Sequence, residues 1–333
     1  GGCPHILAEP QRTNLVTYSE DFTQWTKSNA SLINTITSTV ISPDGVSYAN
    51  KLYPIGAGSN AYIKQTIAGD CFSIFVKKGE RKWILIYGGF GSSNVWFDSE
   101  NGVFGTVLSE ATATVESFGN DWYRIKILWT QNSTQVRIYN VDGDNSLVST
   151  GNGTDGLYIW GAQLEVGSYA TSYIPNFGTA AGVTRNQDIF TRDGIGSLIN
   201  STEGVLFLEM AALSNDGTNR TIALSDGTGN NLVRLYFSNS SNRIVAQVKV
   251  GGSTQVTFDI TGITVIDFNK VALKYKENDF SIWINGVERG TDTSGTTPTS
   301  MNRLALDNGS GSENLFGKVK QLQVYKTALT DEQ

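Results

Sequence analysis

The chain has 333 residues, too many for one ordinary hydrophobic core and enough for two domains of roughly 150 residues each. Only 17% of the residues are charged, so Ser, Thr, Asn and Gly must supply much of the polar surface, as is typical of strands and turns rather than helices. The net charge of −6 argues against a nucleic-acid partner, and no apolar window of about 18 residues predicts insertion into a membrane.

The first half of the chain alternates apolar and polar residues with a period of two, the pattern of half-buried strands. Gly, Asn and Asp separate these segments at intervals of roughly ten residues. Asn101-Gly102 is a signal of a two-residue hairpin turn. The series is typical of a β-sandwich or jelly roll. Its predicted strands are residues 71–77, 83–87, 95–98, 123–129, 135–141 and 157–160.

The alternation stops between residue 173 and about residue 198, and a second series of strands follows. No stretch of ten or more residues shows the apolar stripe of a helix. The sequence therefore predicts an all-β fold, with two antiparallel β-sandwich (jelly-roll) domains in tandem. The first covers residues 1–176 and includes an extended N-terminal segment, residues 177–197 form a linker, and the second domain covers 198–333. The predicted strands of the second domain are 204–212, 220–224, 232–237, 243–250, 255–260, 270–276, 280–284, 303–306 and 319–325.

Several motifs of the first domain occur together in one known family. They are residues 14–22 (NLVTYSEDF) with Trp25, residues 119–124 (GNDWYR), and residues 160–167 (WGAQLEVG) followed by 170–175 (ATSYIP). This set resembles a module found repeatedly in phage tail-fibre and tailspike proteins, and the resemblance covers roughly residues 1–190. It implies a jelly-roll carbohydrate-binding module.

The second domain, residues 195–333, is similar to laminin-G or concanavalin A-like lectin domains. The similarity is carried by residues 204–209 (GVLFLE), 282–286 (IWING) and 321–325 (QLQVY). The two resemblances together imply non-catalytic binding of a polysaccharide or cell-surface glycan, in a virion tail or outside the cell. The ends of the chain resemble the interior of a longer polypeptide. Fibres of this type are commonly trimeric, so a homotrimer and contacts with other virion proteins are alternatives to a monomer.

Strand parity predicts where such a glycan would bind. Sugars stack their C–H faces on aromatic rings, and an aromatic side chain on the outer face of a strand is explained by a ligand. In residues 83–87, for example, Ile84 and Ile86 form the inward face, so Trp83 and Tyr87 point outward. The same parity predicts one polar and aromatic sheet face made of Trp83, Tyr87, Trp96, Arg124 and Tyr139. The alternative for these rings is packing under loops or against the second domain.

The other tryptophans of the motifs are expected to be packed. Trp25, Trp122 and Trp160 are predicted to lie in the interior. Trp283 shares its strand with Phe280, and parity alone does not place it.

Catalytic groups are few. The single histidine, His5, lies in an irregular segment. It is predicted to be an ordinary loop residue rather than a member of a nucleophilic triad. Asp98 and Glu100 could share a face as a pair of carboxylates for glycoside hydrolysis, but they flank a turn, which favours a solvated hairpin end. Two alternatives to glycan binding therefore remain, a polysaccharide depolymerase using these two acids and a structural spacer of a virion.

The two cysteines, Cys3 and Cys71, do not form a disulfide framework, and free thiols are expected, with Cys71 buried in a strand. No cofactor is required. A structural Ca²⁺ is an open alternative, because carbohydrate modules of this shape often hold one near the chain ends. The candidate oxygen ligands Glu20, Asp21, Asp142 and Asp144 have no regular spacing, so the sequence assigns none.

Overall fold

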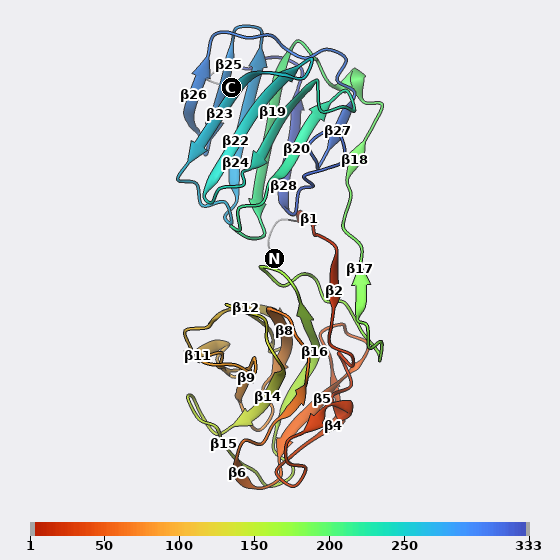
Figure 1. Cartoon of the computed structure of the whole chain (residues 1–333), viewed down its shortest axis with the longest axis vertical. Helices are drawn as coiled ribbons and strands as arrows, with labels where there is room; N and C mark the ends of the chain where they lie inside the picture. Colours follow the sequence, from red (N-terminus) through yellow and green to blue (C-terminus); the bar gives the residue numbers. More distant parts are fainter. Residues whose placement is uncertain (1–3, 331–333) are drawn as a thin grey trace. The chain divides into compact units, whose positions relative to one another are not determined.

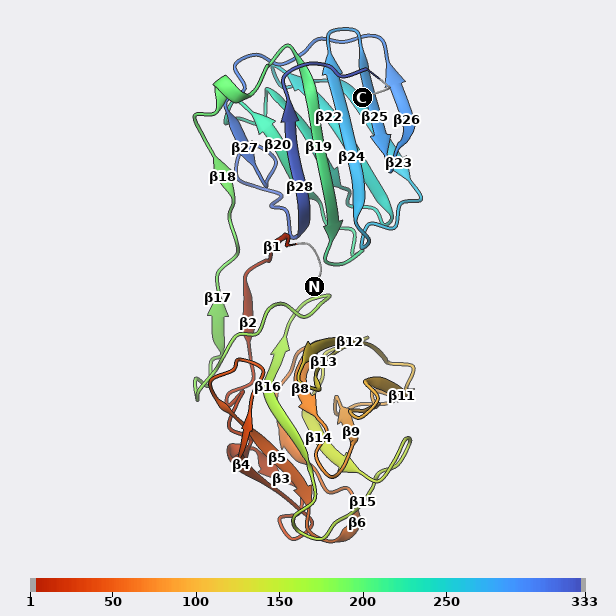
Figure 2. The same ribbon diagram turned by 180° about the vertical axis from the view of Figure 1, so that it is seen from behind.

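The computed structural model describes residues 4–330, whose contacts divide the chain into two compact units (Figures 1 and 2). The N-terminal unit comprises residues 11–186, and the C-terminal unit combines residues 187–330 with residues 4–10. Each unit holds two six-stranded antiparallel sheets. No α-helix occurs among residues 4–330, and hence none there is long and apolar enough to cross a membrane. The predicted all-β fold with antiparallel sandwiches is confirmed.

The N-terminal unit contains two large sheets, called here the β9 sheet and the β8 sheet. The β9 sheet has the order β11 (Val103–Val107), β10 (Val95–Asp98), β9 (Trp83–Tyr87), β14 (Val136–Val141), β7 (Ile63–Gln65) and β3 (Thr26–Lys27). The β8 sheet has the order β12 (Ala111–Gly119), β13 (Trp122–Trp129), β8 (Cys71–Lys77), β16 (Leu157–Glu165), β5 (Tyr48–Pro54) and β4 (Ile33–Ile41). Smaller elements are the pair β15 (Val148–Thr150) and β6 (Ala57–Ser59), the pair β17 (Val183–Arg185) and β2 (Arg12–Asn14), and the 3₁₀ turn η1 (Phe22–Gln24).

The core of the N-terminal unit lies between these two sheets. Ile84 and Ile86 of β9 are fully buried there and share one cluster with Ile125 and Ile127 of β13. Because side chains alternate along a strand, Trp83, Tyr87 and Arg124 project from the opposite faces of their sheets. Trp25 is buried in the same core, as predicted.

The C-terminal unit repeats this layered design with a β19 sheet and a β22 sheet. The β19 sheet has the order β1 (Ile6–Ala8), β28 (Gly317–Tyr325), β19 (Glu203–Ala212), β24 (Asn269–Lys276), β25 (Phe280–Ile284) and β26 (Val287–Asp292). The β22 sheet has the order β18 (Thr191–Arg192), β27 (Arg303–Ala305), β20 (Arg220–Ser225), β21 (Leu232–Phe237), β22 (Arg243–Val250) and β23 (Ser253–Thr261). A 3₁₀ turn, η2 (Gly196–Leu198), precedes β19. Leu206 and Leu208 of β19 meet Val233 and Leu235 of β21 in its core.

The boundaries of the N-terminal unit differ from those predicted for the first domain, both at its start and at its end. Residues 4–10 belong to the C-terminal unit, because β1 pairs with β28. The predicted linker 177–197 contains β17, which pairs with β2, and β18, which pairs with β27. Such pairings are long-range, so the local pattern of these short segments could not indicate them.

The two Asn-Gly turns also differ from each other. Asn285 and Gly286 both have positive φ, 53° and 79°, as a type I′ hairpin requires. The prediction of a two-residue turn at Asn101-Gly102 is wrong. Asp98 pairs with Val103, and residues 99–102 form a longer connection. Asp98 Oδ1 accepts the Glu100 N–H at 2.9 Å, which stabilises this longer turn.

Cys71 is buried in β8, as predicted, and its thiol is free. Burial raises the pKa of this thiol far above its ordinary value, so the thiolate is disfavoured. Cys3, the other cysteine, lies outside the described residues.

Candidate functional site

Four of the five predicted binding residues share the outer face of the β9 sheet. Trp96 of β10 and Tyr139 of β14 lie on either side of Leu85 in β9, and directly opposed residues of an antiparallel sheet point the same way. Trp83 and Tyr87 pack around this cluster. Parity therefore placed these four side chains on one face.

This face is covered at its centre. Trp96 is only 2% exposed, and its Nε1 donates to the Ser146 carbonyl at 2.8 Å. Tyr139 is also 2% exposed and packs on Tyr62, with ring centroids 4.8 Å apart. Neither ring can stack on a sugar in this arrangement. Both rings are packed under loops, which was the predicted alternative to a binding role.

Tyr87 is partly exposed but already has a cationic partner. The Arg137 guanidinium lies 4.9 Å from the Tyr87 ring centroid and 4.6 Å from that of Tyr62. Such contacts between a cation and an aromatic face stabilise a partly exposed surface. Tyr87 and Arg137 thus belong to the packing at the edge of the cluster.

Arg124 does not join the aromatic face. It lies on β13 in the β8 sheet, the other layer of the sandwich, and it is 4% exposed. Its Nη2 donates to Ser73 Oγ at 2.9 Å and to the Thr171 carbonyl at 2.7 Å. The prediction that Arg124 points away from the core is correct, but the predicted sheet is wrong. Alternation along a strand does not identify the sheet to which the strand belongs.

Trp122 and Trp160 are buried on this same outer face of the β8 sheet. Trp122 Nε1 donates to the Ile41 carbonyl at 3.1 Å, and Trp160 Nε1 donates to Ser47 Oγ at 3.0 Å. The loop after β4 therefore covers both rings. Their predicted packing role is confirmed.

Trp83 is half-buried beside a polar pocket of about 610 Å³. Charged groups line it in pairs. Lys82 Nζ lies 2.9 Å from Glu100 Oε2 and 3.2 Å from Asp98 Oδ2, and Arg81 Nη2 lies 2.6 Å from Asp142 Oδ1.

These ion pairs bear on the hydrolase hypothesis. Burial alone would raise the pKa of Asp98, but hydrogen bonds from Asn101, the Glu100 N–H and Lys82 outweigh it and the pKa is lowered. Hydrogen bonds from Lys78 and Lys82 likewise lower the pKa of Glu100. A glycosidase needs one carboxyl group with a raised pKa as its acid. Asp98 and Glu100 both have the opposite shift.

The remaining candidates for chemistry have structural contacts. His5 packs edge-on against Phe268 at 5.8 Å. Of the proposed calcium ligands, Asp142 accepts from Arg81 and Asp144 accepts from the Thr106 N–H at 2.7 Å. Within residues 4–330, no group of three or more His, Cys, Asp or Glu side chains is placed to hold a metal ion.

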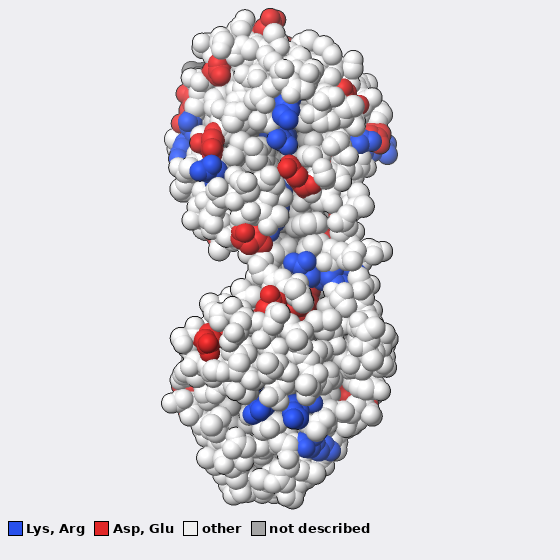
Figure 3. Space-filling view, in the orientation of Figure 1, with Lys and Arg blue, Asp and Glu red and all other residues white. Residues whose placement is uncertain are grey.

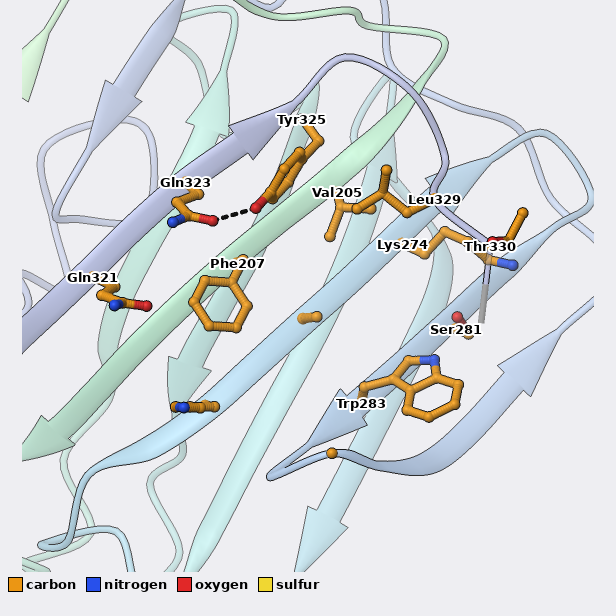
Figure 4. A pocket seen from close by; sticks show the side chains of 13 residues that line it. Val205, Phe207, Lys274, Ser281, Trp283, Gln321, Gln323, Tyr325, Leu329 and Thr330 are labelled. Atoms are coloured by element: carbon orange, nitrogen blue, oxygen red, sulfur yellow. Dashed lines mark hydrogen bonds between the residues drawn. The ribbon is translucent and has the colours of Figure 1, made fainter. Parts of the chain in front are cut away.

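A second aromatic face lies on the outside of the β19 sheet, over a groove of about 360 Å³ (Figure 4). Its central row crosses four strands. Phe207 of β19 is opposite Gln323 of β28 on one side and Ala272 of β24 on the other, and Ala272 is opposite Trp283 of β25. Since neighbouring strands are about 4.8 Å apart, the Phe207 and Trp283 backbones are about 10 Å apart, with only the small Ala272 between them.

Two further rows flank the central one. The first consists of Tyr325, Val205, Lys274 and Ser281. The second contains Gln321 and Lys270, on either side of Glu209. Leu329 and Thr330, which follow β28, line the groove at the Ser281 end (Figure 4). The groove therefore has aromatic rings along its floor and polar side chains at its edges.

Ser281 carries an unusual polar atom. Its Oγ is buried and has no hydrogen-bond partner among residues 4–330. Buried hydroxyl groups are nearly always paired, because leaving one unpaired costs about 1–3 kcal/mol. The oxygen is covered in this structure, so a ligand of the groove would contact it only after a neighbouring side chain had moved.

The charges around this groove are mixed. Lys274 Nζ pairs with Asp279 Oδ1 at 2.8 Å, and Lys320 Nζ lies 3.6 Å from Glu209 Oε1. Lys270 is exposed at the groove edge. Figure 3 shows the side of the β22 sheet, away from the groove, and charged side chains of both signs are sparse there as well. A ligand of this groove is thus selected by ring contacts and hydrogen bonds more than by charge.

This groove is not among the sites that the sequence predicts. Trp283 was left unplaced, yet Phe280, Ile282 and Ile284 all face the core, which puts Ser281 and Trp283 together on the outside. Leu206 and Leu208 likewise alternate with Phe207. The alternation within β19 and within β25 already indicates these outward-facing residues. The two strands are distant in sequence, and only their membership of one sheet brings the residues together.

Comparisons with known proteins find a family match over part of the chain, within the C-terminal unit. Residues 210–333 match the Laminin_G_3 family, described as the concanavalin A-like lectin/glucanases superfamily. This agrees with the predicted similarity of the second domain. No curated protein sequence matches the chain.

Two of the matching solved structures each cover less than half of this chain. The CBM40 module of the Ruminococcus gnavus IT-sialidase, bound to α2,3-sialyllactose, is 16% identical with a TM-score of 0.35, and the match covers 43% of this chain and 95% of that one. Sheep galectin-11, in complex with glycerol, is 11% identical with a TM-score of 0.30 over 41% of this chain and 97% of its own.

Domains LG4-5 of the mouse laminin α1 chain are 8% identical with a TM-score of 0.31, and the match covers 97% of this chain and 91% of that one. All three identities are low. The function of this chain therefore has to be inferred from its own site.

Proposed function

We propose that the chain binds a glycan without reacting on it, through the groove on the β19 sheet. The observation that carries this proposal is the row of Phe207, Ala272 and Trp283, which spaces two rings across a shallow floor. The C–H face of a sugar ring is apolar and weakly positive, and it is attracted to the negative face of an aromatic ring. Two rings on backbones about 10 Å apart can each contact a separate sugar unit of one chain.

Hydrogen-bonding groups lie where the hydroxyls of such a chain would need them. The amide of Gln321 and the ammonium group of Lys270 are exposed along one side of the groove. A pocket with an aromatic floor and a few fixed polar groups is the usual form of a small-ligand site, and about 360 Å³ lies within the range of roughly 300–1,000 Å³ of such sites.

We further propose that the glycan is a host-surface polysaccharide and that the chain is part of a phage tail fibre or spike, or of a secreted adhesin. The support for this is the motif set of residues 14–22, 119–124 and 160–175. Contacts with other copies or with virion proteins would then use surfaces away from the groove.

Affinity electrophoresis of the full chain through gels containing bacterial capsular or algal polysaccharides tests the proposal. Trp283→Ala and Phe207→Ala should each weaken retardation by about tenfold or more, since truncation of a central aromatic anchor costs about 2 kcal/mol. The matched control is Tyr236→Ala. Tyr236 lies on the opposite, β22 sheet and contacts Arg234 at 4.7 Å, so its loss should leave retardation unchanged.

Retardation that survives both groove variants but is lost in Trp83→Ala would move the site to the N-terminal unit. Complete absence of retardation, with the folded chain still binding another virion protein, would favour the spacer role. Release of reducing ends from the polysaccharide would show that the chain is a depolymerase instead.

A further inference from the structure

A smaller pocket, of about 320 Å³, lies in the N-terminal unit where the first and last motifs of that unit meet. Tyr18, Glu20 and Asp21 come from the opening motif, and Phe177 follows the closing one. β4 and β5 complete the pocket. They contribute Thr37, Tyr48 and the buried Asn50.

The backbone around Phe177 is held by hydrogen bonds from both sides. The Ser19 N–H donates to the Asn176 carbonyl at 2.9 Å, and the Asn176 N–H donates back to Ser19 Oγ at 2.8 Å. The Gly178 N–H donates to the Thr17 carbonyl at 2.8 Å. This segment therefore has a fixed conformation, although the sequence pattern had suggested a linker here.

The rings of the pocket are nevertheless exposed. The Phe177 side chain is 74% exposed, and Tyr48 on the β5 side is 53% exposed. An apolar ring that is exposed on a fixed backbone gains nothing for folding. The backbone that carries Phe177 is already ordered, so a ligand that stacks on the ring restricts only the rotation of the side chain.

The polar groups of the pocket are chiefly acceptors. Glu20 is half-buried, and its Oε1 accepts from the Tyr173 hydroxyl at 3.0 Å. Burial raises the pKa of Glu20, and the hydrogen bond from Tyr173 opposes that shift. Asp21 Oδ1 accepts the Thr23 N–H at 3.0 Å. Two carboxyl groups in the lining of one pocket accept hydrogen bonds from hydroxyls and repel anions.

The buried amide Asn50 shapes the floor and is not available to a ligand. Its Oδ1 accepts the Phe22 N–H at 3.2 Å, and its Nδ2 donates to the Glu20 carbonyl at 2.9 Å. This pair of bonds joins β5 to the opening motif. The pocket thus has a rigid floor, two exposed rings and two carboxyl groups.

We infer that this pocket binds the terminal one or two units of a neutral saccharide, as a second site independent of the β19 groove. Phe177 and Tyr48 stack on sugar C–H faces, while Glu20 and Asp21 accept hydrogen bonds from sugar hydroxyls. The pocket volume of about 320 Å³ is sufficient for one or two sugar units. Acidic sugars are disfavoured by the two carboxyl groups.

Titration of the full ¹⁵N-labelled chain, followed by NMR, tests this inference. The probes are the methyl glycosides of glucose, galactose, mannose and N-acetylglucosamine, with glucuronic acid and sialic acid as anionic probes. At least one neutral glycoside should shift the amide signals of residues 176–178. Phe177→Ala and Tyr48→Ala should each weaken that binding by about tenfold. Both side chains are exposed, so these variants should remain folded.

Two controls separate the pocket from other surfaces. Phe118→Ala removes another exposed ring of the same unit, 46% exposed, and should leave the binding unchanged. Trp283→Ala should also leave it unchanged, so the two proposed sites can fail separately. The inference is overturned if no neutral glycoside shifts residues 176–178, if acidic sugars bind more tightly, or if Phe177→Ala has no effect.

Discussion

The outer faces of the β9 sheet and the β19 sheet have the same sequence pattern but different environments in the folded chain. Both carry aromatic residues opposite a row of core side chains. On the β9 sheet, Trp96 donates to the backbone at Ser146 and is buried. On the β19 sheet, Trp283 and Phe207 are only partly buried and line a groove. Alternation identifies the outer face of a strand, and the loops decide whether that face is available to a ligand.

Truncation of the two tryptophans should separate these environments most strongly. Trp96→Ala should lower the free energy of unfolding of the N-terminal unit by about 3–5 kcal/mol, because it leaves a large cavity under the Ser146 loop. Trp283→Ala should change that of the C-terminal unit by less than about 1 kcal/mol. Urea unfolding followed by circular dichroism measures both. Similar losses for the two variants would show that the two faces are equally packed.

Arg124 offers the next largest effect. Arg124→Met should destabilise the N-terminal unit by about 2–4 kcal/mol, because it removes buried hydrogen bonds to Ser73 and Thr171. Lys126→Met is the matched control on the same strand. Its partly exposed ion pair with Glu116, at 2.7 Å, should contribute under about 1 kcal/mol. A stable Arg124→Met variant with weakened glycan binding would restore Arg124 to a binding role.

The contact of Arg137 with two rings predicts a smaller change. Arg137→Ala should cost about 1 kcal/mol of stability, because its guanidinium lies over both Tyr62 and Tyr87. Retardation by polysaccharide should be unaffected, since this face is not the proposed site. Weaker retardation with unchanged stability would instead assign the β9 sheet a role in binding.

The smallest expected effect concerns pH and the loop that covers the β8 sheet. Burial alone would raise the pKa of Asp44, but hydrogen bonds from Ser42, the Val46 N–H and Ser47 lower it to about 2. A lowered pKa in the folded state stabilises the loop above the ordinary value near 3.8, and this stabilisation is lost as the pH falls toward 2. Asp44 is exposed, so the effect should stay below about 1 kcal/mol.

NMR titration of the Asp44 carboxyl, with amide exchange of residues 42–47 between pH 4 and 2, measures this effect. In Asp44→Asn the exchange of these amides should no longer depend on pH in that range. Unchanged pH dependence in the variant would assign the loosening to another group.

The sequence predicted which side chains of a strand face the core better than it predicted which strands pair with one another. Ile84 and Ile86 opposite Trp83 and Tyr87 follow from alternation alone, because each strand obeys it locally. The membership of Arg124 in the β8 sheet and the pairing of β1 with β28 depend on residues far away in the chain.

The candidate groove could have been predicted in part. Ser281 and Trp283 alternate with three core residues, and Phe207 alternates with Leu206 and Leu208, so each outer residue was readable strand by strand. That Ala272 lies between the two rings requires the register of β24 against both neighbours. The burial of Trp96 likewise required the path of a loop.

The indole N–H signals of the seven tryptophans give the most direct test of which face binds glycan. Trp25, Trp96, Trp122, Trp129 and Trp160 are buried, so Trp83 and Trp283 are the reporters of the two units. With oligosaccharides cut from a polysaccharide that retards the chain, the Trp283 signal should shift in proportion to binding while that of Trp83 stays in place. A shift of Trp83 with an unchanged Trp283 signal would contradict the assignment of the β19 groove.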